Sequence, residues 1–397
     1  MEPVSYWLDT TPPLATEPTI PRRAQVVVVG AGVFGASTAL CLARAGADTL
    51  LLDQGSLASG ATGRNAGIVT PGTTEGYLDT VARLGAQRAR QVWQFTEDGA
   101  AGLRQVIAEE GIDAGYRAEG SLALALSAAE ADAQQAAIER LAHDGFDLLW
   151  LDRDALQART PLPLPPHVYG ARYQPRGAVV HSGRLVRGLA LAAQRYGTQI
   201  RQHVAVHAVE PSVVETDQGT IQADHVVLTV NALADGLVPR LKGILTPVRG
   251  QMRATVPLPL RVFPGAWSAN GGGEYWQQTA DGSWALGGMR RVAADMEIGL
   301  TTHALRPEVQ AALDDFVRNL FPTLADTPVA YRWSGIMGFT PDSTPLIGAL
   351  GPGVWIAAGC SGHGMPFAME AGRQIAALVC RGAPDRDMAA FDPARFG

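Results

Sequence analysis

Short apolar runs and helix-spaced apolar positions alternate near the start of the chain. Residues 25–29 are four valines behind a glutamine, and residues 49–52 form a second apolar run. Short runs rich in β-branched residues are typical of strands buried on both faces of a parallel sheet. Between them, residues 36–45 are rich in Ala and Leu and stop at Gly46, as a helix would. Residues 25–53 therefore predict one strand–helix–strand unit.

The turn after the first of these strands has the spacing of a dinucleotide-binding loop, G-A-G-V-F-G from Gly30 to Gly35. Gly30 permits the tight turn, Gly32 lets the backbone approach a pyrophosphate, and Gly35 lets helix and strand pack closely. The helix N-terminus offers N–H groups and a partial positive charge to the phosphates. Asp53, at the end of the second strand, is placed to accept the ribose hydroxyls. An acid there disfavours NADP but leaves both NAD and FAD open.

Later patterns predict a second, more β-rich region. Residues 121–126 are strand-like, and Ser127 with Glu130 is typical of a helix start. Residues 274–278 and 284–288 flank a turn around Gly282 and predict a hairpin. Residues 307–320 carry apolar side chains at helical spacing.

Composition and charge narrow the class of protein. The 397 residues are 47% hydrophobic and 18% charged, which excludes a disordered chain and predicts two or three domains. The net charge of −6 and the lack of a basic tail disfavour nucleic acid, including an amine on tRNA, as the substrate. Three dispersed cysteines without a CxxC pair predict no metal site and no disulfide framework, and suit the cytoplasm. We expect no membrane span, because no apolar stretch reaches about 18 residues.

The segment G-A-T-G-R-N-A-G at residues 60–67 favours FAD. It resembles the second flavin-contacting loop of the FAD-dependent D-amino-acid oxidase-like (DAO) family, which includes glycine oxidase and sarcosine oxidase. Further segments resemble that family in the same order, and the resemblance covers residues 24–380. They are residues 177–186, 204–206, 224–232, 247–251, 333–348 and 359–364. The form G-R-N-A-G resembles γ-glutamylputrescine-oxidase-like members.

The resemblance implies an α/β fold with a Rossmann-like FAD-binding domain and a discontinuous antiparallel-sheet substrate domain. We expect residues 22–100, 166–247 and 331–397 in the first, residues 101–165 and 248–330 in the second, and residues 1–21 as an N-terminal extension. It also implies a helix that opens at the turn 359–364 and runs to about Leu378. The FAD contacts that it implies come from the loops and strand ends named above, namely Gly30, Gly32, Val33, Phe34, Gly35, Asp53, Gln54, Gly63, Arg64, Asn65, Ala66, Gly67, Ile68, Val206, Asn231, Gly338, Gly362, His363, Gly364 and Met365.

Substrate-side candidates follow from the same resemblance. An arginine fork would hold a substrate carboxylate, with Arg290, Arg291 and Arg332 as candidates. Strand alternation allows either Tyr275 and Gln277, or Trp276 and Gln278, to face the flavin. His363 is expected to hydrogen-bond the flavin or to order the backbone.

The chain departs from some relatives at three places. Residues 335–339 contain no cysteine where some members attach the flavin covalently, so we expect noncovalent FAD. Met365 and Pro366 stand where those members carry a carboxylate-binding lysine. The single lysine, Lys242, matches no flavin-facing position. Reoxidation by oxygen, if it occurs, is therefore expected to proceed without a lysine.

The resemblance implies an enzyme that oxidises the C–N bond of a small amine or amino acid. Hydride transfer to flavin N5 would give an imine, water would hydrolyse it to a carbonyl product, and oxygen would reoxidise the flavin to give hydrogen peroxide. Two alternatives stay open: a dehydrogenase that passes electrons to a quinone or carrier, and a flavin-binding subunit of a hetero-complex. A monomer or homo-oligomer is expected otherwise.

Overall fold

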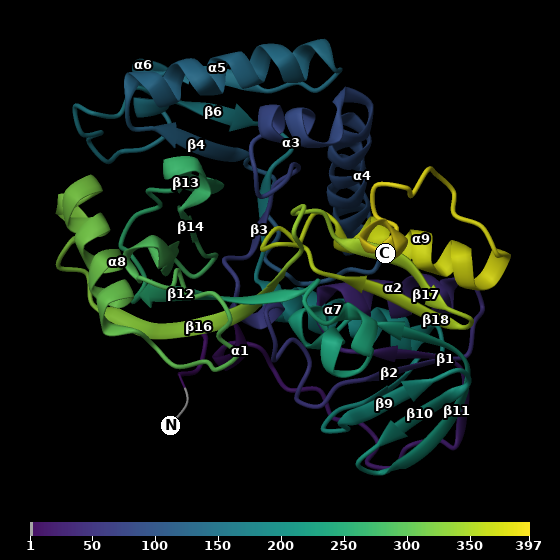
Figure 1. Cartoon of the computed structure of the whole chain (residues 1–397). Coiled ribbons are helices and arrows are strands. Elements are labelled where there is room, and N and C mark those ends of the chain that lie inside the picture. The colour runs from purple at the N-terminus through teal and green to yellow at the C-terminus, as the bar shows by residue number, and fades with distance from the viewer. Residues whose placement is uncertain (1–2) are drawn as a thin grey trace.

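Residues 3–397, the part of the chain that this computed structural model describes, form two eight-stranded sheets and one two-stranded sheet (Figure 1). The first large sheet runs in the order β17-β18-β11-β1-β2-β8, and β9 and β10 extend it from β11. Its strands are β1 (Arg23–Val29), β2 (Thr49–Leu52), β8 (Gln199–Arg201), β9 (Val206–Glu210), β10 (Val213–Thr216), β11 (Gly219–Leu228), β17 (Leu346–Gly351) and β18 (Val354–Ala358).

The predicted strand–helix–strand unit forms the centre of this sheet. β1 lies parallel between β2 and β11, and Val26, Val27 and Val28 are fully buried. Helix α2 (Val33–Arg44) follows β1 and packs against α7 (Ser182–Arg195) and α9 (Ala368–Arg381), and α4 (Ala86–Glu109) packs on α9. The Rossmann-like arrangement expected from the sequence is confirmed.

The second large sheet runs in the order β16-β12-β15-β14-β13-β4-β6-β5 and is antiparallel except between β13 and β4. Its strands are β4 (Ser121–Ala125), β5 (Leu149–Asp152), β6 (Gly170–Gln174), β12 (Thr246–Thr255), β13 (Ala266–Ala269), β14 (Glu274–Gln278), β15 (Trp284–Gly288) and β16 (Val329–Phe339). The predicted hairpin is β14–β15. The sheet also takes in β6 and β16, from segments that the sequence assigned to the FAD-binding domain.

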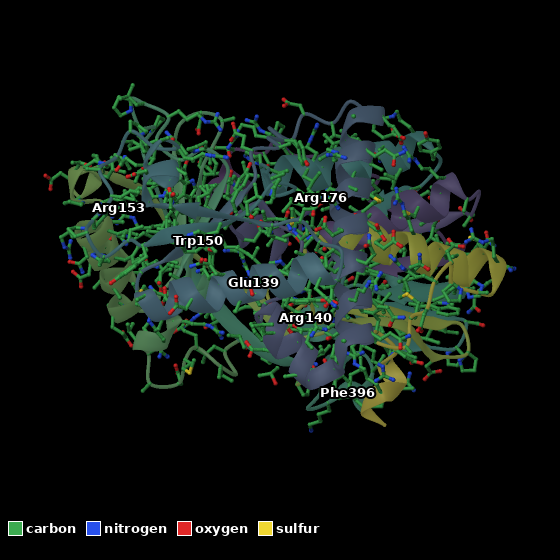
Figure 2. The ribbon with its side chains drawn as sticks, turned by 90° about the horizontal axis from the view of Figure 1, so that it is seen from above. Glu139, Arg140, Trp150, Arg153, Arg176 and Phe396 are labelled. Atoms are coloured by element: carbon green, nitrogen blue, oxygen red, sulfur yellow. The ribbon has the colours of Figure 1, made fainter. Side chains whose placement is uncertain are left out.

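Helices cover the second sheet unequally. The apolar stripe of α8 (Pro307–Leu320) packs on one face against a cluster that includes Trp267, Trp276 and Trp284. Helix α5 (Ala128–His143) forms the top of Figure 1 and lies nearest the viewer in Figure 2, where Glu139 and Arg140 mark it. Ser127 caps α5 as predicted, although Glu130 accepts from the N–H of Leu126.

The remaining α-helices and strands are short and lie outside the two large sheets. They are α1 (Tyr6–Asp9), α3 (Tyr77–Leu84), α6 (Arg153–Gln157) and the two-stranded sheet of β3 (Ile68–Val69) and β7 (Ala178–Val179). No helix within residues 3–397 combines the length and the apolar character needed to cross a membrane.

Candidate flavin and substrate site

The dinucleotide turn between β1 and α2 leaves no room for side chains. Gly30 has a φ of 102°, and a Cβ on Gly35 would lie 1.8 Å from the Gly30 carbonyl oxygen. Helix α2 begins at Val33 after Gly32, which has no side chain to cap the first N–H groups, although Thr62 Oγ1 accepts from the N–H of Val33 at 3.0 Å. The geometry fits a pyrophosphate at an open helix N-terminus.

Asp53 closes this turn from the end of β2. Its Oδ2 accepts from the N–H of Ala31 at 2.6 Å, and its Oδ1 accepts from the N–H of Gly55 at 2.8 Å. Burial raises the pKa of Asp53, and these two hydrogen bonds oppose the rise. Each carboxylate oxygen has a further lone pair, so the side chain fits ribose hydroxyls as partners. The neighbouring Gln54 is exposed.

Five consecutive carbonyls in the loop of residues 63–67 accept hydrogen bonds from distant side chains. Those of residues 63, 64 and 65 accept from Ser5 Oγ, from Trp333 Nε1 at 2.8 Å and from Trp7 Nε1 at 2.5 Å. Those of residues 66 and 67 both accept from Gln277 Nε2, at 2.6 and 3.0 Å. No peptide in the described chain is cis, so each N–H of the loop points opposite to the preceding carbonyl. Two of these N–H groups already have acceptors, because that of Arg64 donates to the Ala61 carbonyl at 3.2 Å and that of Gly67 donates to Asn65 Oδ1 at 2.8 Å. The loop therefore presents the N–H groups of Asn65 and Ala66 to its other side.

The N-terminal segment is part of this arrangement. Ser5 caps α1, and the ring of Trp7 is fully buried 5.0 Å from that of His181. Thr10 Oγ1 lies 2.8 Å from His181 Nε2. From the sequence, residues 1–21 were expected only as an extension, and residues 1–2 lie outside the described part. The apolar triplet from Tyr6 to Leu8, inside a Pro- and Thr-rich stretch, was the available signal.

The turn around His363 differs from the sequence expectation. Helix α9 begins at Ala368 rather than at the turn, and it ends at Arg381 rather than near Leu378. The reason is that residues 361–362 and 365–367 form turns, with the N–H of His363 bonded to the Cys360 carbonyl. The first turn of α9 therefore lies beyond Pro366, and the expected helix start at Gly364 is wrong.

His363 itself is held by the backbone. Its Nε2 lies 2.8 Å from the Thr70 carbonyl oxygen, a hydrogen bond that favours a higher pKa. Burial dominates and lowers the pKa of His363, and the positive charge of Arg172 lowers it further. The imidazole is therefore neutral and donates to Thr70. Gly362 beside it has a φ of 84° and approaches Met337 and Phe339.

Asn231 lies near this turn, where β11, β16 and β18 end. Its Oδ1 accepts from the N–H of Gly359 at 3.2 Å, and a Cβ on Gly338 would lie 2.7 Å from the same atom. Ile68 begins β3, and Val206, half-buried, begins β9 in the outer part of the first sheet. The side chains of Val33, Phe34 and Met365 are buried in the hydrophobic core under this turn.

The second sheet turns Tyr275 and Gln277 toward the loop of residues 63–67. Trp276 packs on the α8 face, and Gln278 accepts from the N–H of Val262. Gln277 is buried and its amide is used by the loop and by the Val180 carbonyl, so it positions the loop. Tyr275 stays half-buried, and burial raises its pKa while the nearby charge of Arg290 lowers it.

The three arginine candidates have different surroundings. Arg332 is bonded to Asp314 at 2.7 Å and to Gln310 at 2.8 Å, and Arg291 is paired with Glu274. Arg290 lies over the ring of Phe339, with its guanidinium carbon 5.2 Å from the ring centroid. Of the three, it alone has no carboxylate partner within the described chain.

One arginine that the sequence analysis missed also has no such partner. Arg172 lies on β6, and its guanidinium makes no hydrogen bond or ion pair to any of residues 3–397. Its positive charge lowers the pKa of His363. No local motif marks this position, because its neighbours along β6 belong to an ordinary strand.

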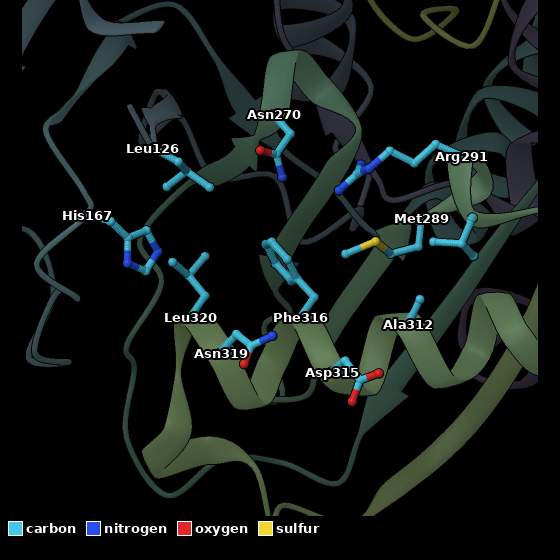
Figure 3. Close-up of a pocket in the computed structure, with 11 residues that line it drawn as sticks. Leu126, His167, Asn270, Met289, Arg291, Ala312, Asp315, Phe316, Asn319 and Leu320 are labelled. Atoms are coloured by element: carbon cyan, nitrogen blue, oxygen red, sulfur yellow. The ribbon is translucent and has the colours of Figure 1, made fainter. Parts of the chain in front are cut away.

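A pocket on the second sheet has Arg291 in its lining, but not Arg290, Arg332 or Arg172. It has a volume of about 350 Å³ and is bounded by α8, by Asn270 and Met289, and by His167 (Figure 3). Phe316 of α8 lines it, so it opens on the α8 side of the sheet, opposite Tyr275. It therefore does not adjoin the loop of residues 63–67.

Cysteines and metal ligands add no further group to the site. Cys41, Cys360 and Cys380 are free, and burial raises the pKa of the Cys360 thiol to about 11. Residues 3–397 bring together no group of three or more His, Cys, Asp or Glu side chains able to hold a metal ion. Lys242 is exposed.

Comparison with curated sequences finds relatives along almost the whole chain. The probable oxidoreductase OrdL of Rhizobium meliloti (strain 1021) is 27% identical, over 97% of this chain and 90% of its own length. The γ-glutamylputrescine oxidoreductase of Escherichia coli (strain K12) is 28% identical, over 91% of this chain and 84% of its own. The 4-methylaminobutanoate oxidase (formaldehyde-forming) of Paenarthrobacter nicotinovorans is 28% identical over 95% of this chain, which spans only 46% of that protein.

Solved structures share the fold. The L-proline dehydrogenase of P. horikoshii superposes with a TM-score of 0.82 at 21% identity, covering 95% of this chain and 98% of its own. The glycine oxidase of Geobacillus kaustophilus gives 0.80 at 23% identity, covering 94% and 98%. The family model described as DAO, FAD dependent oxidoreductase, matches residues 25–378. The chain is thus an FAD-dependent oxidoreductase of the DAO family.

Proposed function

We propose that this enzyme oxidises the C–N bond of a small amine or amino acid to an imine, which water hydrolyses to the carbonyl product. Bound FAD supplies the hydride acceptor for this chemistry. One observation carries the proposal: the loop of residues 63–67 and the Tyr275 side of the second sheet face each other through Gln277. Relatives named for amine substrates support it, namely the γ-glutamylputrescine oxidoreductase and the 4-methylaminobutanoate oxidase.

In this proposal the chain's own residues bind, orient and exclude water. The turn at Gly30 and Asp53 would hold the dinucleotide, and the loop N–H groups and the turn at His363 would hold the flavin ring. The FAD contacts given in the sequence analysis remain proposed contacts. Neutral His363 donates to Thr70 and so fixes the turn, while Tyr275 would form a wall of the substrate site. Positioning of this kind supplies much of a catalytic effect when the cofactor performs the reaction itself.

FAD is proposed to be noncovalent, since residues 335–339 offer no thiol and Cys360 is a buried thiol with a raised pKa. Acid precipitation of the yellow protein should leave the colour in solution. Colour that stays in the pellet contradicts this part.

Oxygen is the proposed electron acceptor and hydrogen peroxide the proposed product. A dehydrogenase that reduces a quinone or carrier is the competing function. The free thiols suit the cytoplasm. A stable, active monomer or homo-oligomer in gel filtration would argue against a flavin subunit that acts only in a hetero-complex.

The test is anaerobic bleaching of the flavin band near about 450 nm against a panel of amines and amino acids, followed by air. Bleaching by an amine and return of the band in air support an oxidase. Bleaching that only a quinone analogue reverses supports the dehydrogenase. A flavin that no amine bleaches contradicts both.

A further inference from the structure

Arg172 is unusual among the arginines near the two sheets. It is half-buried on β6, yet its guanidinium has no hydrogen-bond acceptor and no carboxylate within residues 3–397. Helix α5 contributes only the Gln134 Oε1 that accepts from the Arg172 main-chain N–H at 3.0 Å. By contrast, Arg253 and Arg332 of the same sheet share Asp314. An unpaired guanidinium in a partly desolvated place is costly, so it calls for an anion.

The strand register places Arg172 in line with Tyr275. Arg172 pairs with Ala123 of β4, Ala123 with Ser268 of β13, and Ser268 with Tyr275 of β14. Directly paired residues share one face of a sheet, so these four side chains form a single row. Gly287 continues the row beyond Tyr275.

The middle of this row consists of small side chains. Ala123 and Ser268 are small and remain half-buried, whereas Leu122 and Trp267 beside them are buried on the opposite, α8 face. Neighbouring strands lie about 4.8 Å apart, so the three strand steps from Tyr275 to Arg172 span roughly 14 Å of backbone. Two large polar side chains thus flank a strip of small ones on the face that looks toward the loop of residues 63–67.

The far end of the row approaches the turn at His363. The charge of Arg172 acts on His363, and Gly362 beside it approaches Met337 and Phe339. Tyr275 Oη in turn lies 3.5 Å from the Cβ position of Gly250, as Met337 Cε does at 3.1 Å. The row and the turn therefore border the same space from two sides.

We propose that Arg172 binds the carboxylate of the substrate, which makes the substrate an amino carboxylate rather than a simple alkylamine. The strip of Ala123 and Ser268 accommodates the chain between the carboxylate and the reacting amine beside Tyr275. Arg290, stacked on Phe339 at the other side of Tyr275, is the competing anchor. This inference rests on the proposed function only for the reacting amine, because the carboxylate site is testable without turnover.

The first experiment measures binding to the oxidised FAD-loaded enzyme by calorimetry. The probes are the linear carboxylates from acetate to pentanoate, each paired with its primary amide. The variants are Arg172→Met, Arg172→Lys, Arg290→Met and, as a control with the same change of charge, Arg88→Met on the exposed face of α4. FAD content and melting temperature verify that each variant is folded and loaded.

Loss of a charge-assisted, forked contact should weaken carboxylate binding in Arg172→Met about tenfold to hundredfold. The carboxylate affinity of Arg172→Lys should lie between that of Arg172→Met and that of the parent, because lysine keeps the positive charge but not the forked guanidinium. Arg88→Met should bind within about twofold of the parent, and amides should bind weakly to all. Unchanged carboxylate binding in Arg172→Met, a loss confined to Arg290→Met, or a parent that binds no carboxylate would each overturn the proposal.

The second experiment uses turnover. Kinetics with glycine, 3-aminopropanoate, 4-aminobutanoate and their N-methyl forms are compared with those of methylamine, ethylamine and propylamine. In the parent, amino carboxylates should have the higher kcat/KM, and Arg172→Met should remove that preference mainly through KM. If no amine bleaches the flavin but carboxylates still bind through Arg172, the proposed function fails and the anion site stands. A parent that prefers the alkylamines overturns the substrate class.

Discussion

The loop of residues 63–67 and the row from Arg172 to Tyr275 border the proposed site from two sides but are built in opposite ways. In the loop, five successive carbonyls have side-chain donors, drawn from the first and last parts of the chain. In the row, Arg172 has no partner within residues 3–397 and small side chains follow it. A cofactor of constant shape suits a loop fixed by the protein alone. In the row, the substrate itself must supply the partner that the Arg172 guanidinium lacks. The unpaired guanidinium therefore indicates which chemical group the substrate carries.

The largest effect is expected from filling the dinucleotide turn. Gly35→Ala places a Cβ 1.8 Å from the Gly30 carbonyl, and the backbone has to move. We expect a loss of stability of about 3 kcal/mol and little bound FAD. Gly60→Ala is the matched control, because nothing lies within 4 Å of its Cβ position. Melting temperature and the ratio of flavin to protein measure both. A Gly35→Ala protein that is as yellow and as stable as the control would contradict the packing.

Asp53 offers the next largest effect. Asp53→Asn should weaken FAD binding roughly tenfold to hundredfold at neutral pH, through lost charge-assisted hydrogen bonds. Burial raises the pKa of Asp53, so Asp53 takes up a proton at a higher pH than an ordinary carboxyl group does. As the pH falls, the parent should therefore begin to lose FAD at that higher pH. Apo-protein stability should move the other way, rising as the pH falls through that raised pKa, because the folded state binds the proton more readily.

Titration of FAD release by fluorescence checks this, with Asp53→Asn as the variant whose release should not show that step. Equal pH profiles for the two proteins would show that Asp53 does not hold the ribose.

A smaller effect is expected where the N-terminal segment meets the loop. Trp7→Phe keeps an aromatic ring but removes the indole N–H that donates to the Asn65 carbonyl, together with part of a fully buried side chain. The loss should be about 1 kcal/mol, or roughly fivefold faster FAD release. Trp355→Phe is the control, because its Nε1 makes only a long contact of 3.4 Å to His225. Similar FAD release from both variants would mean that the segment supports the fold but not the cofactor.

The parts of the proposed site that the sequence indicates are local ones. The turn at Gly30 and the loop of residues 63–67 are continuous motifs whose glycines are needed for backbone approach. The donors Ser5, Trp7 and Trp333 could not be predicted, because each acts across more than 55 positions of sequence. Likewise, nothing in the local sequence shows that Arg332 is held by Asp314 or that Arg172 has no partner.

The smallest effect concerns the single lysine. Lys242 is exposed and precedes β12, away from the loop of residues 63–67. Lys242→Met should therefore leave the rate of flavin reoxidation by oxygen within about twofold, a barrier change of about 0.4 kcal/mol. Stopped-flow mixing of the reduced enzyme with oxygen measures it. A large loss of rate with FAD retained would place the lysine near the flavin.

Because the side chains that donate to the loop are far apart in sequence, they become available at different times during synthesis of the chain. Ser5 and Trp7 leave the ribosome first, but Gln277 and Trp333 follow only when most of the chain has been made. The dinucleotide turn, formed by residues 30–53, can fold early, whereas the five loop carbonyls cannot all be bonded until residue 333 is free to dock. With the FAD contacts proposed above, only a nearly finished polypeptide binds FAD firmly, and a chain that ends before Trp333 should emerge colourless.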